Sequence, residues 1–298
     1  LKDIIPAFMD NSKYKGTAYA VPDLASARAF FWNKDILSGA GVKKAPTTWD
    51  EMTAASKAIK KKYPDVYPYC LPLGVEEAQM PFTTWGGGNG ARLYDAKTNK
   101  YTINTKEYKA ALDYLKSLVD QKLTQPNPGK TNRTDGCWAL FAKGKVGMVD
   151  GGVFLPDWLT KNGGSDIDWG AGAFPHAAGK SDITVGVQDY FKGYKANGHQ
   201  AEIQKFLTFL FQPDNYAGFL KAAGGFIPAT KSAGKIAETD PIIGPYIKLL
   251  PKAIFYPGTV GSWQACKSAI VTYMGNAMSN TAKALSSIQA KCDAANKK

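Results

Sequence analysis

The stretch from Asp135 to Phe154 constrains the fold of this chain more than any other. Trp138 and Phe141 stand about one helical turn apart, and Gly144 can take the left-handed conformation that ends many helices. Residues 146–149 then have the composition of a buried strand. This order predicts a helix, a tight turn and a strand.

Two glycines and an aromatic residue come directly after that strand. Gly151 and Gly152 would let a ligand approach the backbone closely, and Phe154 places an aromatic face at the carboxyl end of the strand. Open α/β sheets bind their ligands at this edge. The segment is therefore a candidate ligand site, although a Gly-rich αβ connection that binds nothing would have the same pattern.

Length and composition limit the kind of molecule that carries this segment. A chain of 298 residues exceeds the size at which single cores usually split, so we expect two lobes. Its 7 Trp and 15 Tyr can fill a core, and they also suit flat apolar ligands such as sugar rings. No apolar run approaches transmembrane length. The chain starts at Leu1, without a signal peptide, in what reads as the middle of a domain, so we expect a trimmed fragment.

The net charge of +12 raises the question of nucleic acid. The lysines are scattered, however, and no basic motif of a DNA or RNA module appears, so nucleic-acid binding is not expected. A basic surface that faces an anionic envelope is the simpler interpretation. The four cysteines form no CxxC pair and His176 is far from His199, so a zinc site of the usual spacing is absent. We expect no metal and no cofactor.

The rest of the chain alternates strand and helix signals. A turn and strand over residues 13–22 should stop at Pro22, and 29–32 is a second β-prone run. Residues 48–51 form a capping box for a helix that stops at Pro64. The other expected elements are strands at 69–73, 169–175 and 183–187, a helix at 106–119, a helix whose apolar face is Ile203, Phe206, Leu207 and Leu210, a helix ending at Gly224-Gly225, and a return crossing at 226–228.

Two loops lie between the predicted strand at 69–73 and the helix at 106–119. Residues 74–79 read as a polar loop that contains Glu77 and Gln79. Trp85 then precedes a glycine loop at 86–90. This glycine loop is not a phosphate loop, because the Lys-Ser/Thr pair that would complete one is missing.

The end of the chain predicts two helices joined near Ser279 and a disulfide between them. The two apolar stripes are Cys266, Ile270, Tyr273 and Leu285, Ile288, Cys292. Cys266 and Cys292 are equally distant from Ser279, so antiparallel helices bring them into register and a bridge would staple the last helix. An even cysteine count fits an oxidising exterior, although buried free thiols would look the same from sequence. Cys70 and Cys137 could also form a bridge, with less geometric support.

In this order, the signals resemble the extracellular solute-binding proteins of sugar-importing ABC transporters, the maltose-binding protein type. The pieces that carry the resemblance, over nearly the whole chain, are Tyr19-Ala-Val-Pro, Phe31-Trp-Asn-Lys-Asp-Ile-Leu, Pro46-Thr-Thr-Trp-Asp-Glu, the Gly86 to Gly90 loop, Phe141-Ala-Lys-Gly-Lys-Val-Gly-Met, Ala173-Phe-Pro, and Ser262-Trp with its helical pair.

The resemblance implies an α/β fold of the two-lobe periplasmic-binding-protein-like type II class, with a ligand cleft between the lobes. It implies a remnant of the N-terminal lobe at 1–22, the C-terminal lobe at 23–183, a return to the N-terminal lobe at 184–228, and the C-terminal lobe with its helical hairpin at 229–298. The family has about a quarter of its length before the position of Leu1. We therefore expect that the fragment alone binds poorly and exposes apolar surface.

The resemblance also implies the ligand-binding residues. Glu77 and Gln79 fall where the second lobe of the family offers hydrogen bonds and stacking, and Asp189-Tyr190 lies in a crossing that often faces ligand. Gly151, Gly152 and Phe154 match a glycine-rich segment that carries a cleft aromatic residue. The usual Trp of that segment is missing, Val153 takes the nearest position, and Phe154 would have to replace it. The remaining candidates are Trp263, a stacking aromatic that could instead be a core residue, and Trp85.

Two functions follow from these expectations. The first is a monomeric protein outside the cytoplasm, anchored to the membrane by a missing lipid-modified segment, that captures a neutral oligosaccharide and delivers it to ABC permease subunits. The second is a glycoside-acting enzyme that uses carboxylates such as Glu76, Glu77, Asp150 and Asp189. No nucleophile motif, cofactor loop or metal cluster supports catalysis, so binding is the favoured function.

Overall fold

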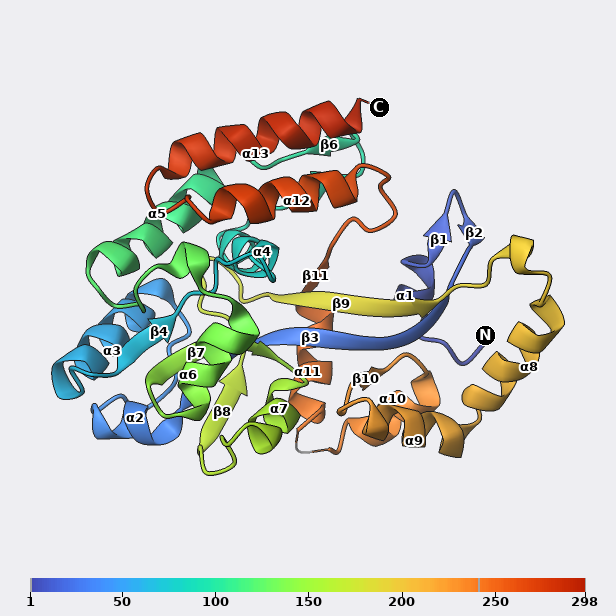
Figure 1. The fold of residues 1–298 in the computed structure, drawn as a ribbon, viewed down its shortest axis with the longest axis horizontal. Helices are drawn as coiled ribbons and strands as arrows, with labels where there is room; N and C mark the ends of the chain where they lie inside the picture. The colour runs from blue at the N-terminus through green and yellow to red at the C-terminus, as the bar shows by residue number, and fades with distance from the viewer. Residues whose placement is uncertain (1, 241, 298) are drawn as a thin grey trace.

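A mixed sheet of seven strands forms the centre of the computed structural model, which describes residues 2–240 and 242–297 (Figure 1). The strand order is β11-β9-β3-β7-β4, and β8 and β10 also pair with β3. The strands are β3 (Val21–Asn33), β4 (Tyr67–Cys70), β7 (Val146–Gly152), β8 (Trp169–Gly172), β9 (Thr184–Phe191), β10 (Ile227–Pro228) and β11 (Ala253–Phe255). Two short hairpins are β1 (Lys13–Tyr14) with β2 (Thr17–Ala18) and β5 (Tyr94–Asp95) with β6 (Lys100–Tyr101).

Strand β3 connects two lobes. Its first half, up to Ala27, pairs with β9 and β10, and its second half, from Arg28, pairs with β7 and β8. In Figure 1, β3 and β9 run side by side from the helices on the left to those on the right. The fold is therefore the expected two-lobe α/β architecture. The boundaries expected at 22/23, 183/184 and 228/229 fall in or beside these crossing strands, and that division into domains stays a prediction.

Pro22 does not stop the strand, which was the expectation from sequence. The strand begins at Val21 and continues through Pro22 to Asn33, so the run at 29–32 belongs to the same strand. Pro22 is tolerated because it is the second residue of the strand and the pairing with β9 shifts register between Pro22 and Ala25. The chain reverses before this strand at Lys15 and Gly16, which both have positive φ.

The larger lobe, on the left in Figure 1, has two hydrophobic cores, one on each side of the sheet. Neighbouring residues of β3 point to opposite faces, so Phe30 belongs to one core and Phe31 to the other. The helices of this lobe are α2 (Lys34–Gly39), α3 (Trp49–Lys62), α4 (Gln79–Gly87), α5 (Lys106–Asp120), α6 (Ala139–Ala142), α7 (Leu155–Lys161), α12 (Trp263–Met274) and α13 (Thr281–Asn296). The expected capping box at Thr48 and Glu51 is present at the start of α3.

The smaller lobe, on the right, surrounds the other ends of β3 and β9 (Figure 1). Its helices are α1 (Pro6–Asp10), α8 (Gln200–Leu210), α9 (Pro213–Ala222) and α10 (Lys231–Ala237). The apolar face expected for α8 is largely uncovered among the described residues, since Leu210 is buried but Phe206 is 52% exposed. The remaining helical segments are α11 (Gly244–Leu249), η1 (Pro128–Lys130), the π-helical η2 (Arg133–Trp138), η3 (Lys195–Asn197) and η4 (Leu250–Lys252).

The segment from Asp135 to Phe154 forms the expected helix, turn and strand. Helix α6 follows the π-helical turn η2, Gly144 has a φ of 64°, and β7 begins at Val146. The π-helical turn was not expected. Gly151 and Gly152 are the last two residues of β7 rather than the residues after it, because they still pair with Ala29 and Arg28 of β3.

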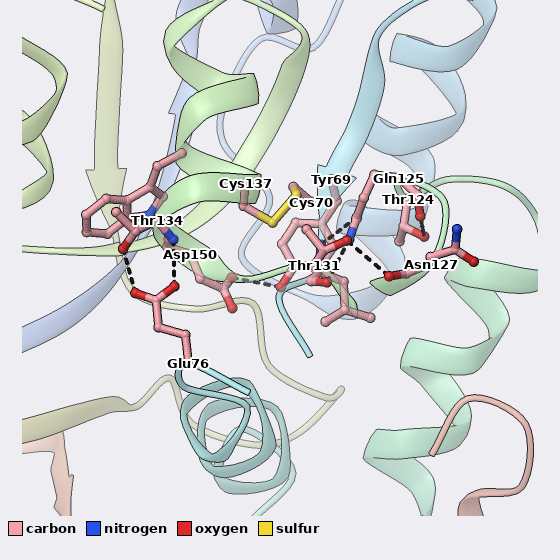
Figure 2. Close-up of a disulfide and its surroundings, with 12 residues drawn as sticks. Tyr69, Cys70, Glu76, Thr124, Gln125, Asn127, Thr131, Thr134, Cys137 and Asp150 are labelled. Carbon is pink, nitrogen blue, oxygen red and sulfur yellow. Dashed lines mark hydrogen bonds between the residues drawn. A yellow bond between two sulfur atoms is a disulfide. The ribbon is translucent and has the colours of Figure 1, made fainter. Parts of the chain in front are cut away.

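All four cysteines form disulfides. Cys266 of α12 is bonded to Cys292 of α13, with 4.5 Å between their Cα atoms. Cys70 at the end of β4 is bonded to Cys137 in η2, as Figure 2 shows. All four residues are fully buried. The first bridge joins the two helices of the C-terminal hairpin, and the second fixes the start of the central helix-turn-strand segment to the neighbouring strand.

Candidate functional site

A cavity of about 900 Å³ lies between the two lobes. On the side of the smaller lobe it is lined by the two residues that follow α1, the β1–β2 hairpin and β9. On the side of the larger lobe it is lined by Arg92, Leu93, Tyr94 and Ala96 and by the segment from β11 into α12. From β9, Gly186, Val187, Gln188 and Tyr190 line the cavity, and Asp189 does not.

Aromatic side chains line this cavity from both lobes. Tyr256 and Trp263 are stacked, with ring centroids 5.2 Å apart and an angle of 20° between the rings. On the opposite wall, Tyr14 and Tyr19 pack edge to face and are 52% and 64% exposed. Flat apolar faces with polar edges nearby suit a sugar ring. The aromatic residues in the lining are Tyr14, Tyr19, Tyr94, Tyr190, Phe255, Tyr256 and Trp263.

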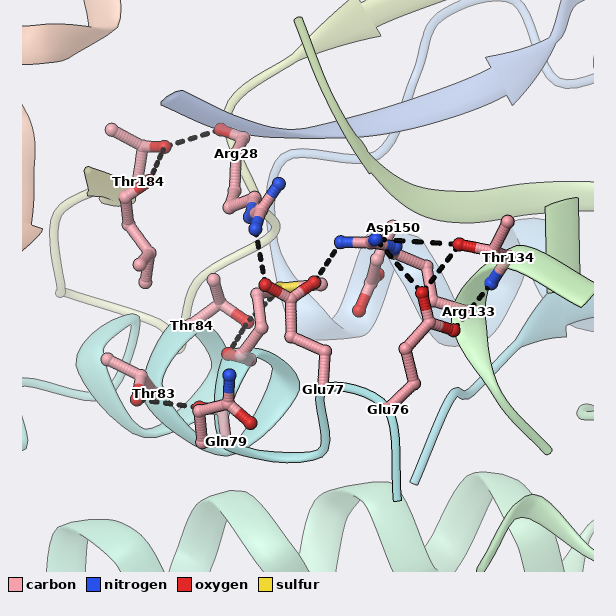
Figure 3. Close-up of polar contacts among 12 residues, drawn as sticks. Arg28, Glu76, Glu77, Gln79, Thr83, Thr84, Arg133, Thr134, Asp150 and Thr184 are labelled. Atoms are coloured by element: carbon pink, nitrogen blue, oxygen red, sulfur yellow. Dashed lines mark hydrogen bonds and ion pairs between the residues drawn. The ribbon is translucent and has the colours of Figure 1, made fainter. Parts of the chain in front are cut away.

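A second group of candidate residues surrounds two arginines, Arg28, which is buried, and Arg133, which is partly buried. Glu77, just before α4, forms ion pairs with Arg28 of β3 and Arg133 of η2 (Figure 3). The Phe154 ring centroid lies 5.0 Å from the Arg28 guanidinium and 5.3 Å from that of Arg133. Glu76 pairs with Arg133 at 3.0 Å. These carboxylates are thus held by cations of the protein itself, and the cluster connects α4, β3 and η2.

Asp150 is buried next to this cluster and belongs to the core. Its Oδ1 accepts a 2.7 Å hydrogen bond from the Tyr69 hydroxyl, as Figure 2 shows. Burial raises the pKa of the Asp150 carboxyl to about 7. The Trp85 indole donates to the same Tyr69 hydroxyl at 3.1 Å. Trp85 is fully buried, so its ring offers no surface to a ligand in this conformation.

Only two of the nine candidate ligand residues, Tyr190 and Trp263, line the cavity. Gln79 is 3% exposed because it is the first residue of α4, a helix whose residues are all buried, rather than part of a polar loop. Gly151 packs against Phe31, so a side chain there would collide with that ring. The remaining candidates, Glu77, Gly152, Phe154 and Asp189, lie around or near Arg28.

Most of the residues that line the cavity are not among the candidates predicted from sequence. Tyr14 and Tyr19 flank a tight turn, and Tyr256 lies seven residues before Trp263. The repeated tyrosines in the Lys13 to Tyr19 segment were the available signal, since exposed aromatic residues on a short hairpin have little core to join. Tyr256 carried no local signal, because only the path of the chain between β11 and α12 brings its ring onto Trp263.

Among residues 2–240 and 242–297, no group of three or more His, Cys, Asp or Glu side chains is placed to hold a metal ion. Within the same ranges, no helix has the length and apolar composition needed to cross a bilayer.

Two α/β lobes joined by crossing strands, with a cavity between them, define a binding-protein fold. This fold is shared with solved sugar-binding proteins. The maltose-bound protein of Thermotoga maritima superimposes with a TM-score of 0.83 at 18% identity, covering 98% of this chain and 76% of that one. The cyclic alpha-maltosyl-1,6-maltose binding protein of Arthrobacter globiformis gives a TM-score of 0.80 at 20% identity, covering 99% and 76%.

Residues 1–217 match the family model described as bacterial extracellular solute-binding protein, and the chain belongs to this family. Relatives named as binding proteins in Brucella abortus and Brucella suis are 31% identical over 87% of the chain. The chain spans 62% of the length of these relatives. The diacetylchitobiose binding protein of Streptomyces coelicolor is 27% identical over 72% of the chain and 50% of its own length.

Proposed function

We propose that this protein binds a sugar, with an oligosaccharide as the expected form, in the cavity between its lobes and delivers it to an ABC importer. The observation that carries the proposal is the stacked Tyr256–Trp263 pair in a cavity lined by further tyrosines from the opposite lobe. Rings on both walls can contact the two faces of a saccharide when the lobes close. The family and the sugar-binding relatives support the same function.

The proposal includes no catalysis. A glycosidase needs two carboxyl groups on either side of the scissile bond. Among the described residues, no Asp or Glu lines the cavity. Glu76 forms an ion pair with Arg133, Glu77 forms one with Arg28, and Asp150 is buried. This arrangement favours a ligand that leaves the cavity unchanged.

The proposed partners are the sugar and the permease subunits of the importer, and the proposed working form is a monomer that binds no nucleic acid. Two buried disulfides favour an oxidising location outside the cytoplasm, in agreement with the family description. Anchoring to the membrane through a lipid-modified segment remains part of the proposal.

A calorimetric screen of oligosaccharides against the purified chain tests the proposal, followed by chromatography of the recovered sugar. We expect saturable but weak binding of at least one oligosaccharide at one site per chain, in keeping with the poor binding expected from sequence, together with recovery of intact sugar and a rise in melting temperature with ligand concentration. Hydrolysed sugar in the recovered fraction would favour the enzyme, and a screen without any binding sugar would contradict the proposal.

A further inference from the structure

The charged side chains that line the cavity between the lobes are all cationic. They are Lys13, Arg92 and Lys192. The lining contains no Asp or Glu among the described residues, although the chain has 25 acidic residues in total. An adjoining cavity of about 800 Å³ shares Lys13 and adds Lys15, again without a described carboxylate in its lining. The aromatic walls of the site are therefore accompanied by charge of one sign.

Two of these cations have no carboxylate partner in the described part of the chain. Lys13 is neutralised, because its Nζ lies 2.7 Å from Asp10. Arg92 and Lys192 take part in none of the ion pairs of residues 2–240 and 242–297. Arg92 donates from Nη1 to the carbonyl oxygen of Ala91 at 2.8 Å, which leaves most of its guanidinium donors for another acceptor.

Arg92 and Lys192 approach the cavity from different lobes. Arg92 lies between α4 and β5, in the larger lobe, and Lys192 directly follows β9, on the smaller one. Lys192 lines the cavity beside Gln188 and Tyr190 of β9. A ligand held between the aromatic walls would therefore meet one cation from each side.

Closure of the lobes would make this arrangement costly for a neutral ligand. Partial burial removes water from each cation and brings the positive charges closer together, and both effects raise the free energy of the closed state. A negative group on the ligand instead lowers the free energy of the closed state, since charge-assisted hydrogen bonds to Arg and Lys are stronger than neutral ones. A cleft lined by one sign of charge also concentrates ligands of the opposite sign.

We propose that the ligand of this cavity is an acidic oligosaccharide, in which Arg92 and Lys192 bind the anionic group while the Tyr256–Trp263 pair stacks on a sugar ring. The shared chemistry is a saccharide that bears a carboxylate or a sulfate. This proposal rests on the proposed function and narrows it, because the neutral oligosaccharide expected from sequence is replaced by a charged one.

Calorimetry with four probes tests the proposal on the intact 298-residue chain. The probes are digalacturonate, its neutral dimethyl ester, a sulfated disaccharide and maltose. We expect an anionic probe to bind at least about tenfold more tightly than the ester and maltose, and its affinity to fall as NaCl rises, because salt screens exposed charges. The comparison of digalacturonate with the sulfated sugar identifies the anionic group.

Charge-removing variants locate the effect. Arg92→Gln and Lys192→Gln should each weaken binding of the anionic probe several-fold and remove much of its salt dependence, with little change for a neutral sugar. Lys57→Gln is the matched control, since Lys57 is an exposed lysine on α3, away from the cavity lining. This substitution should change neither the affinity for the anionic probe nor the salt dependence of that affinity. All three residues are exposed, so the variants should keep the melting temperature of the parent chain.

The outcomes separate this inference from the proposed function. If maltose or the ester binds as tightly as the anionic probes, the chain is a sugar-binding protein and the acidic-ligand inference is wrong. If anionic and neutral sugars all fail to bind, both proposals are contradicted. If an anionic probe binds but the Arg92 and Lys192 variants bind it as the parent does, the assignment of these two residues is overturned.

Discussion

Trp263 combines a packing contact with a place in the cavity lining. It is the first residue of α12 and only 4% exposed, because its ring is stacked on Tyr256. The two alternatives considered from sequence, a stacking residue for ligand and a core residue at a helix start, are therefore both compatible with its position. The effects of a substitution at Trp263 on ligand affinity and on the free energy of unfolding therefore have to be measured separately.

Replacing Trp263 by Ala should weaken binding of the sugar found in the screen by about 1–3 kcal/mol, the scale of one aromatic contact. It should also lower the free energy of unfolding by about 3 kcal/mol, because it removes a large buried ring. Calorimetry and urea unfolding measure the two effects. Trp263→Phe keeps a flat ring and should retain most of the stability, so unchanged affinity in both variants would remove Trp263 from the binding site.

Asp150 is the buried carboxyl whose titration should be visible in the stability of the protein. Its pKa is raised from 3.8 to about 7 by burial, so the folded protein holds this proton over a range in which the unfolded chain has lost it. The stabilising contribution of the protonated carboxyl is present below the unfolded value and is lost as pH rises through about 7. The Tyr69 hydroxyl donates to Oδ1 of this carboxyl.

Replacing Asp150 by Asn should therefore remove a pH dependence. The free energy of unfolding of the parent chain, minus that of Asp150→Asn, should decrease as pH rises from about 4 to about 8. Denaturant unfolding at several pH values measures this difference. Asp168→Asn is a control, since Asp168 is an exposed carboxyl paired with Lys34 at the surface. A difference that stays flat across the range would contradict a raised pKa at Asp150.

Strand β9 and the C-terminal helices show how whole elements create the site. Strand β9 and the residue after it bring Gln188, Tyr190 and Lys192 to the cavity, and β11, which pairs with β9, leads into the segment in which Tyr256 stacks on Trp263 at the start of α12. Helix α12 is in turn fixed to α13 by the Cys266–Cys292 disulfide and packs on the core of the larger lobe. The position of Trp263 thus depends on the C-terminal hairpin.

The two disulfides should contribute unequally to stability. In the chain-entropy model, closing a loop over the 26-residue separation of Cys266 and Cys292 stabilises by about 3.5 kcal/mol. The 67-residue separation of Cys70 and Cys137 gives about 4.4 kcal/mol. Cys266→Ser with Cys292→Ser should therefore lower the free energy of unfolding somewhat less than the Cys70 and Cys137 double variant. Peptide mapping without reductant checks the bonds themselves, and free Cys266 and Cys292 peptides would refute the hairpin bridge.

At the scale of the whole molecule, the two lobes differ in how well their helices are covered. The larger lobe buries both faces of its sheet under helices. In the smaller lobe, α8 leaves Phe206 and Phe209 52% and 60% exposed. Ile203 and Leu207 of the same helix line a further cavity of about 1010 Å³. Exposed apolar surface of this kind promotes association.

The proposed working form is a monomer, and we expect the 298-residue chain to associate through this exposed face of α8 only as its concentration rises. Phe206→Ser combined with Phe209→Ser should shift the chain toward monomer in light scattering coupled to size-exclusion chromatography. Lys205→Ser, on the same helix, is the control and should not have this effect. A parent chain that stays monomeric at high concentration would show that α8 does not mediate self-association.

The sequence alone determined the features that depend on local chemistry. The capping box at Thr48, the turn at Gly144 and the antiparallel register of Cys266 and Cys292 follow from short-range geometry, and the order of motifs indicated the two-lobe fold. Pro22 was misjudged because its tolerance depends on where β9 pairs. The segment with Gln79 and Trp85 reads as a polar loop and a glycine loop, and the resemblance implies Gln79 as a ligand residue, whereas packing on α5 and α12 buries the whole of α4.

Tertiary structure alone decided which residues share the cavity. Tyr14, Arg92, Lys192 and Tyr256 are far apart along the chain, and no local period relates them. They meet because β3 and β9 cross between the lobes and set the two walls opposite each other. The same packing turns Glu77 toward Arg28 and Arg133. A sequence records which side chains are present, but the sign of the charge around a cavity depends on which of them the fold directs into it.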